Sequence, residues 1–292
     1  MIQTNDAREQ LFATVGVVGC GQMGAGIAEV CARSGTDVRV VEARAAGLDA
    51  GRARIVASLD RGVRAEKLTG ADRAETLGRI SFGTDLAALA DCDLVVEAVS
   101  EDPAVKARVF EQLDGLLAAH AVLASNTSSI PIIDLAAVTA HPERVLGVHF
   151  FNPVPVQRLI EVIPTQLTAD ETVRRVSEFS TAVLGKTVVL ARDRAGFVIN
   201  ALLVPYLVSA IRMLEAGVAT ADDIDNGMVL GCAHPMGPLR LIDLIGLDTV
   251  QAIAESMYEE FKEPLYAPPP LLRRMVAAGT LGQKTGRGFH TY

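Results

Sequence analysis

Short, mostly apolar runs recur along the first two thirds of the chain, with room for a helix between successive runs. They lie at residues 15–18, 38–41, 94–99, 122–124 and 145–150, and valine predominates in them. Strands buried on both faces of a parallel sheet need continuous apolar runs, whereas strands with one wet face alternate apolar and polar residues. The pattern therefore predicts a buried parallel β-sheet.

The segments between these runs have the spacing and length of helices. Helical patterns cover residues 23–33, 103–119 and 130–140. Pro103 suits a first helical turn, and Gly35 suits the position just after a helix end. Strands that alternate with helices in this way predict an α/β fold built from β-α-β units.

Two more strands and a charged insertion complete the predicted first domain. Runs at 158–163 and 187–191 extend the sheet, and an amphipathic helical pattern at 171–184 lies between them. Residues 45–77 are charged and helical in pattern, which predicts a helical pair that projects from the sheet.

The pattern changes near residue 195. Strand-like runs end there, and apolar helical segments follow that are separated by glycine and proline. We therefore expect two domains, 1–194 and 195–292, the second all-helical, with the boundary at the polar cluster 192–194.

One stretch, residues 197–213, is apolar enough to raise the question of a membrane. Asn200, Pro205 and Arg212 interrupt it, and it is about a turn too short to cross a ~30 Å hydrocarbon core. We expect a buried helix there and no membrane partner.

Composition narrows the class of protein. Of 292 residues, 50% are hydrophobic and 21% charged, which is enough apolar surface for two folded domains. Lys plus Arg number 27 against 35 Asp plus Glu, for a net charge of −8, and no basic block occurs. Nucleic acid is therefore not an expected partner, because binding it needs a basic face.

The four cysteines and the N-terminus bear on the compartment. The cysteines form neither a CxxC pair nor a zinc-ligand spacing, so we expect core thiols, no metal and no disulfide framework. Residues 1–10 are polar and lack the basic and apolar regions of a signal peptide. These features predict a cytoplasmic protein.

A glycine-rich loop follows the first strand and opens the first helix. Gly19 allows the tight turn, Gly21 lets the backbone approach a pyrophosphate, and Gly24 permits close packing of helix on strand. Gln22 and Met23 belong to the helix N-terminus, which then faces the phosphates. By itself the motif is not decisive, since such turns also serve packing alone.

Glu42 favours the dinucleotide interpretation. It ends the second strand, 18 residues after Gly24, where a carboxylate can accept hydrogen bonds from the adenosine ribose and repel a 2′-phosphate. The predicted cofactor is NAD, and the nearby Arg44 leaves NADP open as the alternative.

A histidine and a carboxylate stand where the substrate is expected. His149 ends a buried strand, and the polar cluster 125–129 ends the preceding one, at the edge of the sheet where ligands bind. Glu161 lies twelve residues beyond His149 among apolar neighbours, in a strand that can return beside it. We therefore predict a His–Glu pair, in which the carboxylate orients the imidazole and stabilises its protonated form.

With these residues in view, the chain resembles the 3-hydroxyacyl-CoA dehydrogenase family, in particular its short-chain bacterial 3-hydroxybutyryl-CoA dehydrogenases. The motifs that carry the resemblance occur in order at residues 19–24, 95–99, 125–129, 149–155, 196–200, 234–238 and 282–289. The resemblance implies a Rossmann-type domain followed by an all-α domain that builds a homodimer. It also implies NAD-dependent oxidation of an acyl-CoA substrate in fatty acid β-oxidation.

Family roles then fall on individual positions. His149 matches the catalytic base and Glu161 its carboxylate partner. Ser128 matches the serine at the reacting hydroxyl, and Asn200 matches an asparagine from the second domain. The histidine would take the C3 hydroxyl proton as hydride leaves C3, while the serine and the asparagine would orient the substrate.

Further matches concern the cofactor and coenzyme A. The positions expected around NAD are Glu101, Lys106, Ser128, Asn152 and Lys284. Ser58 is expected beside the CoA moiety, and the nearby cations that could meet its phosphates are Arg61, Arg64 and Lys67. Without the family, the three charged residues of the NAD set would pass as solvated surface charges.

The chain departs from the family pattern at four places. Position 42 is Glu where Asp is frequent, and Asp102 stands where Asn is common. Ala201 replaces a frequent Arg, and His290 replaces a common aromatic residue. Two other functions stay open at this point: a dehydrogenase of free hydroxy acids or sugar acids, and a non-catalytic NAD(H)-binding protein.

Overall fold

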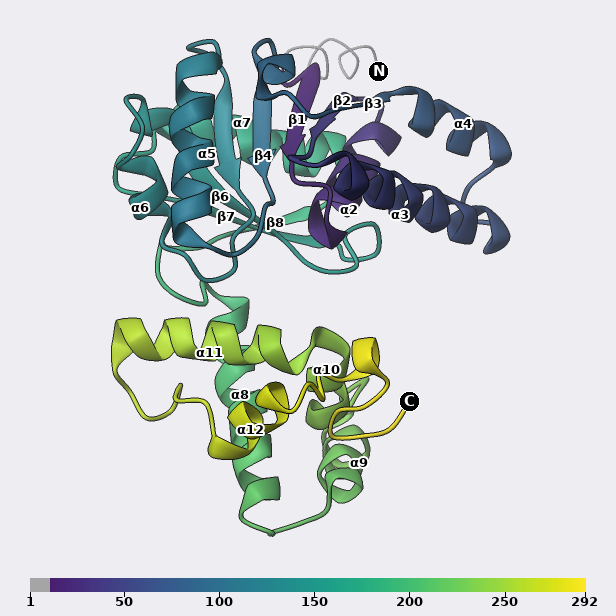
Figure 1. Ribbon diagram of the computed structural model, residues 1–292, viewed down its shortest axis with the longest axis vertical. Coiled ribbons are helices and arrows are strands. Elements are labelled where there is room, and N and C mark those ends of the chain that lie inside the picture. Colours follow the sequence, from purple (N-terminus) through teal and green to yellow (C-terminus); the bar gives the residue numbers. More distant parts are fainter. Residues whose placement is uncertain (1–10) are drawn as a thin grey trace. The chain divides into compact units, whose positions relative to one another are not determined.

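The computed structural model describes residues 11–292. The chain divides into two compact units, one ending at Asp193 and the other running from Arg194 to Tyr292 (Figure 1). The polar stretch 1–10, on which the expectation about a signal peptide rests, lies outside the described residues.

An eight-stranded sheet forms the centre of the first unit. Its order is β3-β2-β1-β4-β5-β6-β7-β8, and every pair of neighbours is parallel except β6 and β7. The strands are β1 (Thr14–Val18), β2 (Asp37–Val41), β3 (Ile80–Gly83), β4 (Leu94–Glu97), β5 (Val122–Ser125), β6 (Val145–Phe150), β7 (Leu159–Pro164) and β8 (Thr187–Leu190). The predicted α/β class with a mostly parallel sheet is confirmed.

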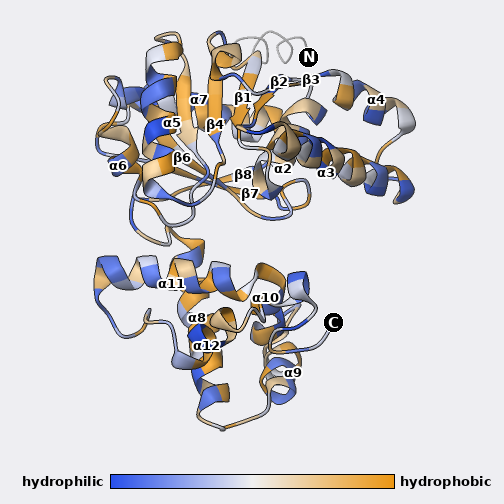
Figure 2. Ribbon diagram, in the orientation of Figure 1, coloured by the Kyte–Doolittle hydropathy of each residue, from blue (hydrophilic) through white to orange (hydrophobic). Residues whose placement is uncertain are grey.

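Burial explains which strands the apolar pattern detects. All residues of the central strands β4, β5 and β6 are buried, as a sheet covered on both faces requires. Strand β3 is missing from the prediction because it lies at the edge of the sheet and holds only two large apolar residues, Ile80 and Phe82. Figure 2 shows the strands as the most hydrophobic part of this unit.

Six helices connect the strands of the first unit. They are α2 (Gln22–Arg33), α3 (Ala45–Arg64), α4 (Gly70–Gly78), α5 (Pro103–Leu116), α6 (Ile132–Ala136) and α7 (Asp170–Glu178). Single 3-10 turns lie at Leu86–Leu89 and Pro142–Arg144, and a π-helical turn, Phe179–Val183, continues α7. The predicted helical pair is confirmed as α3 and α4, which extend away from the sheet (Figure 1).

The predicted helix ends differ from the structure in α5 and α6 and agree with it after α2. Helix α5 stops at Leu116 because Leu117 has an extended backbone. Helix α6 is five residues long and begins only after Pro131, whose own conformation is not helical. Gly35 has a φ of +91° just after α2, the left-handed conformation that ends many helices, as predicted.

The second unit is helical throughout its main elements. It contains α8 (Ile199–Glu215), α9 (Ala221–Cys232), α10 (Pro238–Ile245), α11 (Leu247–Phe261), α12 (Pro270–Ala277) and a short turn, Gln283–Thr285. Pro238 and Pro270 occupy first helical turns. The core includes Leu207, Ile211 and Leu239.

The apolar stretch at 197–213 becomes most of helix α8. Its buried side chains include Val204 and Leu207, although Leu202 is 73% exposed, so the helix is buried along one face only. In residues 11–292, no helix has both the length and the apolar character needed to cross a bilayer.

Candidate active site

The glycine loop between β1 and α2 is shaped by the absence of side chains. A Cβ at Gly24 would lie 1.9 Å from the carbonyl oxygen of Gly19, so the close approach of helix to loop requires glycine. A Cβ at Gly21 would meet nothing within 4 Å. That open space beside the backbone is what a dinucleotide pyrophosphate needs.

The N-terminus of α2 is suited to hold phosphate. Gly21 is the N-cap residue and has no side chain with which to cap the first-turn N–H groups, among them those of Gln22 and Met23. These N–H groups and the positive end of the helix dipole attract an anion. The residues present therefore fit a bound dinucleotide.

Glu42 lies directly after β2 and touches the glycine loop. Its Oε2 accepts a hydrogen bond from the backbone N–H of Cys20, at 3.0 Å. The carboxylate is therefore held at the loop, at the carboxyl edge of the sheet, where a ribose acceptor is expected. Arg44, the reason for leaving NADP open, is exposed two residues further on.

His149, Glu161 and Ser128 come together at the carboxyl edge of the sheet. His149 Nδ1 lies 2.8 Å from Glu161 Oε2, and His149 Nε2 lies 2.9 Å from Ser128 Oγ. Glu161 is fully buried and His149 is 4% exposed. The predicted return of β7 beside β6 is what brings the two side chains together.

The contacts decide which ring nitrogen carries the proton in the neutral state. An ionised carboxylate can only accept, so Nδ1 donates to Glu161. Nε2 is then the acceptor of the hydrogen bond that the Ser128 hydroxyl donates. A substrate hydroxyl at the same place would meet a basic nitrogen, which is the requirement for proton abstraction.

The end of β6 is fixed by a residue that the sequence interpretation left unassigned. The side-chain oxygen of Asn126 accepts a hydrogen bond from the N–H of Phe150, at 2.9 Å. Phe151 packs edge-on against the His149 ring, with centroids 4.6 Å apart. Both contacts restrict the position of the imidazole.

Glu101 accepts several hydrogen bonds from the loop that carries Ser128. Its Oε1 accepts hydrogen bonds from the N–H groups of Ser128 and Ser129, at 2.8 and 3.1 Å, and from the hydroxyls of Thr127 and Ser129. Burial raises the pKa of this carboxyl, but the Lys106 ammonium and these hydrogen bonds outweigh burial and lower the pKa below its usual value.

Lys106 is buried rather than solvated. Its side chain is 1% exposed, and its Nζ lies 2.7 Å from Glu97 Oε1 and 3.2 Å from Glu101 Oε2. The surface-charge interpretation is therefore wrong for this lysine. Glu97 is absent from the predicted site, although it sits in an apolar run as Glu161 does, and that signal could have found it.

The remaining predicted cofactor and substrate positions are spread over both units. Asn152 is exposed in the turn after β6. In the second unit, Asn200 is buried in the first turn of α8, and the Lys284 ammonium lies 2.6 Å from Asp248 Oδ1.

The predicted CoA positions lie on or next to α3. Ser58 is half-buried and hydrogen-bonded to Glu29 of α2. Burial raises the pKa of the Glu29 carboxyl, although the hydrogen bond from Ser58 and the charge of Arg33 act to lower it. The three cations are exposed; they are Arg61, Arg64 and Lys67. The exposed cations are free to reach a phosphate from this face of the helical pair.

The cysteine prediction needs one correction. Cys20, Cys31 and Cys92 are buried free thiols, as expected, but Cys232 is exposed. It ends α9, where the chain turns through a left-handed Ala233 and leaves the core. Within residues 11–292, no cluster of His, Cys, Asp and Glu has the arrangement of a metal site.

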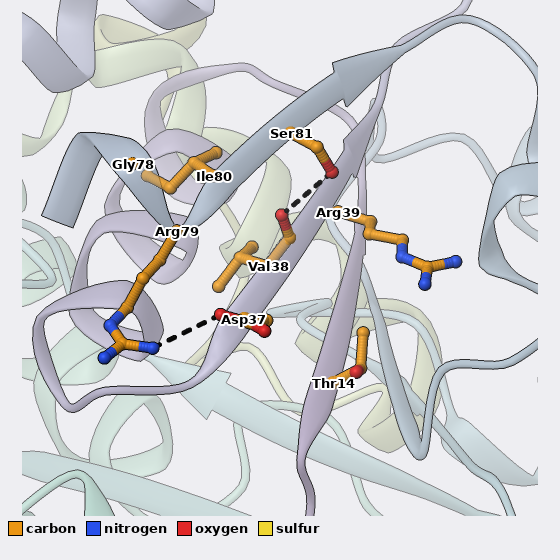
Figure 3. A pocket seen from close by; sticks show the side chains of 8 residues that line it. All are labelled: Thr14, Asp37, Val38, Arg39, Gly78, Arg79, Ile80 and Ser81. Carbon is orange, nitrogen blue, oxygen red and sulfur yellow. Dashed lines mark hydrogen bonds and ion pairs between the residues drawn. The ribbon is translucent and has the colours of Figure 1, made fainter. Parts of the chain in front are cut away.

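A cavity of about 280 Å³ lies at the opposite edge of the sheet, where β1, β2 and β3 begin. Figure 3 shows Arg79 there, reaching Asp37 at 3.3 Å. Arg39 pairs with Asp91. Both guanidinium groups are paired with carboxylates, so this cavity is poorly suited to bind an anionic substrate.

Comparison with known proteins agrees with this geometry. Residues 14–194 match the model of the 3-hydroxyacyl-CoA dehydrogenase NAD binding domain, and residues 196–292 match that of the 3-hydroxyacyl-CoA dehydrogenase C-terminal domain. The chain is 60% identical, over 279 residues, to a 3-hydroxybutyryl-CoA dehydrogenase of Mycobacterium tuberculosis, with 95% of this chain and 98% of that one covered.

Two crystal structures are similar over nearly the whole chain. One is M. tuberculosis FadB2, with a TM-score of 0.96, 59% identity and coverage of 97% of this chain and 100% of that one. The other is (S)-3-hydroxybutyryl-CoA dehydrogenase PaaH1 from Ralstonia eutropha, with a TM-score of 0.90, 46% identity and coverage of 96% and 99%.

Proposed function

The chain belongs to the 3-hydroxyacyl-CoA dehydrogenase family, and from that premise we propose that it interconverts (S)-3-hydroxyacyl-CoA and 3-ketoacyl-CoA with NAD. The substrates are short chains such as 3-hydroxybutyryl-CoA and acetoacetyl-CoA, and the reaction belongs to fatty acid β-oxidation. The observation that carries the proposal is the contact series from Ser128 through His149 to Glu161.

The first unit holds NAD. Gly19, Gly21 and Gly24 shape the loop, the first turn of α2 receives the pyrophosphate, and Glu42 accepts from the adenosine ribose. The remaining cofactor positions of this unit are Glu101, Lys106, Ser128 and Asn152, and the family match adds Lys284 of the second unit. When bound, the nicotinamide supplies the redox chemistry, since it accepts or returns the hydride.

His149 is the acid and base of the reaction. In the direction of oxidation its Nε2 takes the proton of the C3 hydroxyl, and the ring becomes an imidazolium. Glu161, in contact with Nδ1 on the other side of the ring, stabilises that positive charge. In the direction of reduction the imidazolium returns the proton to the C3 oxygen.

Ser128 and Asn200 orient the substrate. The Ser128 hydroxyl, 2.9 Å from Nε2, donates to the reacting oxygen when substrate takes its place beside the imidazole. Asn200 is assigned a substrate contact from its place in the family motif. Ser58 and the cations Arg61, Arg64 and Lys67 receive the CoA moiety.

The protein acts in the cytoplasm as a homodimer formed through its second unit. Two leucines of the second unit are compatible with the dimer: Leu202 is 73% exposed and Leu230 is 84% exposed, and a partner subunit would cover such side chains. Light scattering at micromolar concentration measures the mass directly, and a monomer would contradict the dimer.

The decisive experiment follows NADH consumption with acetoacetyl-CoA, with free acetoacetate and with longer 3-ketoacyl-CoA substrates. Turnover of acetoacetyl-CoA but not of the free acid supports the proposal. The reverse preference would move the substrate to free hydroxy acids or sugar acids. Folded protein that binds NADH and turns over none of these substrates would be a binding protein without catalytic activity.

A further inference from the structure

Glu97 is a buried carboxylate at the end of β4 to which the proposed function gives no task, and it forms an ion pair with the buried Lys106 of α5. Lys106 Nζ lies 2.7 and 3.0 Å from the two oxygens of Glu97, and the two side chains are 1% and 0% exposed. Burying two charges is costly, and apolar replacements of similar volume are often at least as stable. Fold stability alone is therefore a weak reason for placing charges there.

The Glu97 carboxylate is held from several sides. Its Oε1 accepts a hydrogen bond from the N–H of Val99 at 2.6 Å, and its Oε2 accepts one from the hydroxyl of Ser125 at 2.7 Å. Ser125 ends β5, the parallel neighbour of β4, and Val99 belongs to the segment that follows β4. These hydrogen bonds restrain the Glu97 carboxylate at the edge of the sheet.

Lys106 links Glu97 to a second carboxylate, Glu101. The same ammonium that binds Glu97 lies 3.2 Å from Oε2 of Glu101, a residue on the loop before α5. The other oxygen of Glu101 accepts from the N–H groups of Ser128 and Ser129. One lysine therefore connects the sheet edge to the loop on which Ser128 stands.

From these contacts we propose that Glu97 is a positioning residue of the dehydrogenase: by fixing Lys106 it holds Glu101 against residues 127–129, and this sets the Ser128 hydroxyl at His149. The inference rests on the proposed function for the role of Ser128. Glu97 itself touches no reacting atom.

The arrangement requires charge at Glu97 and not merely a hydrogen-bond acceptor. With Glu97 ionised, the ammonium is shared between two carboxylates and remains between them. With a neutral amide in its place, the attraction toward the sheet edge weakens, and the ammonium moves toward Glu101 alone. A displacement of about 1 Å in a positioning group can cost roughly 10²-fold in rate.

The test is Glu97→Gln, which keeps the shape of the side chain and removes its charge. We expect kcat for acetoacetyl-CoA reduction to fall roughly tenfold or more, while the KM for acetoacetyl-CoA changes less than about twofold. In a Ser128→Ala background the same substitution should change kcat less than about twofold, because the hydroxyl that it positions is gone. Amide hydrogen exchange at Ser128 and Ser129 should become faster.

Asp114→Asn is the matched control. Asp114 lies on the same helix as Lys106 and forms another buried ion pair, with Arg144 at 2.7 Å. Its loss should lower stability but leave kcat and the exchange of Ser128 unchanged. A purely structural role for Glu97 predicts that the two variants behave alike, and that result would overturn the proposal.

A second variant covers the case in which Glu97→Gln does not fold. The double substitution Glu97→Gln with Lys106→Met removes both charges of the buried pair, and it should show the same faster exchange at Ser128 and Ser129. Wild-type kcat and wild-type exchange in either folded variant overturn the proposal. Amide exchange does not depend on turnover, so it decides the positioning role even if the wild-type protein reduces no 3-ketoacyl-CoA and the proposed function fails.

Discussion

His149 and Glu161 are direct partners in the register of the antiparallel strands β6 and β7, and their side chains meet at 2.8 Å. The backbone pairing therefore places the carboxylate beside the ring. Successive residues of a strand point to opposite faces, so a slip of one residue would send one of the two side chains to the other face of the sheet. The buried apolar neighbours Ile160 and Val162 make such a slip costly.

Replacing the histidine tests the proton transfer. His149→Gln should lower kcat by roughly 10²-fold or more, the scale of positioned acid–base catalysis. Binding of NADH should be nearly unchanged, because the glycine loop and Glu42 follow β1 and β2, away from His149 on β6. Steady-state kinetics and NADH fluorescence titration measure the two effects. A large loss of NADH affinity would mean that the residue serves cofactor binding.

Replacing the carboxylate separates orientation from charge. Glu161→Gln should lower kcat less than His149→Gln does, since the amide can still hold the ring but no longer stabilises the imidazolium. The double variant should be little worse than His149→Gln alone, because the carboxylate acts through the histidine. If the two losses of activation free energy add in full, Glu161 has an independent role.

The sequence reveals this dyad because charge stands where burial is expected. Glu161 lies in a run of apolar residues, and a carboxylate there needs a partner. The same reasoning applies to Glu97 in β4, which is equally buried. What the sequence could not show is that Lys106, nine residues further on, returns from α5 to meet it, since that depends on how the helix packs against the sheet.

The edges of the structure were harder to predict than its centre. Strand β3 escapes the apolar pattern because an edge strand needs less burial, and Cys232 is exposed because α9 ends at the surface. Conversely, the central strands are fully buried, so valine-rich runs locate them to within a few residues. The substrate contact proposed for Asn200 depends on tertiary arrangement, and no local pattern encodes it.

Glu42 should control the choice of cofactor. Glu42→Ala should raise the KM for NADH and narrow the preference for NADH over NADPH, because a ribose acceptor and a charge that repels the 2′-phosphate are both lost. The loop also loses the acceptor of the Cys20 N–H. Glu42→Gln serves as the control, since it keeps an acceptor while removing the charge. Unchanged discrimination in both variants would point to Arg44 or another group.

Glu101 should make the stability of the protein depend on pH in the acid range. Its pKa in the folded protein is lowered, with burial opposed by Lys106 and by hydrogen bonds from the Ser128 loop. A carboxyl whose folded pKa lies below its unfolded value of ~4.3 contributes stability above that value. This contribution disappears as the pH falls through the folded pKa.

Denaturant unfolding of the wild type and Glu101→Gln at several pH values measures this linkage. The difference in unfolding free energy between the two proteins should be largest above about pH 5 and should shrink as the pH falls below about 4. Glu171→Gln on the exposed face of α7 is a useful comparison. The pKa of Glu171 is also lowered, mainly by the hydrogen bond from Arg174, but this pair is accessible to water and salt. If the difference in unfolding free energy between the wild type and Glu101→Gln grew on acidification, the lowered pKa of Glu101 would be contradicted.

The four cysteines should differ sharply in reactivity, which tests burial without reference to activity. The pKa values of the thiols of Cys20, Cys31 and Cys92 are raised to about 11, 12 and 11, mainly by burial, and for Cys20 the nearby charge of Glu42 contributes to the rise. Thiolates, not thiols, react with iodoacetamide, so these three should remain unmodified at pH 8 in the folded protein. Cys232 is exposed and should be alkylated.

Peptide mass spectrometry after a short exposure to iodoacetamide identifies the modified residue. The variant Cys232→Ser removes the reactive site as a control, and denaturation before labelling should expose all four cysteines. Modification of Cys20 at a rate similar to that of Cys232 would show that the glycine loop opens far more readily than its packing against Glu42 and α3 implies.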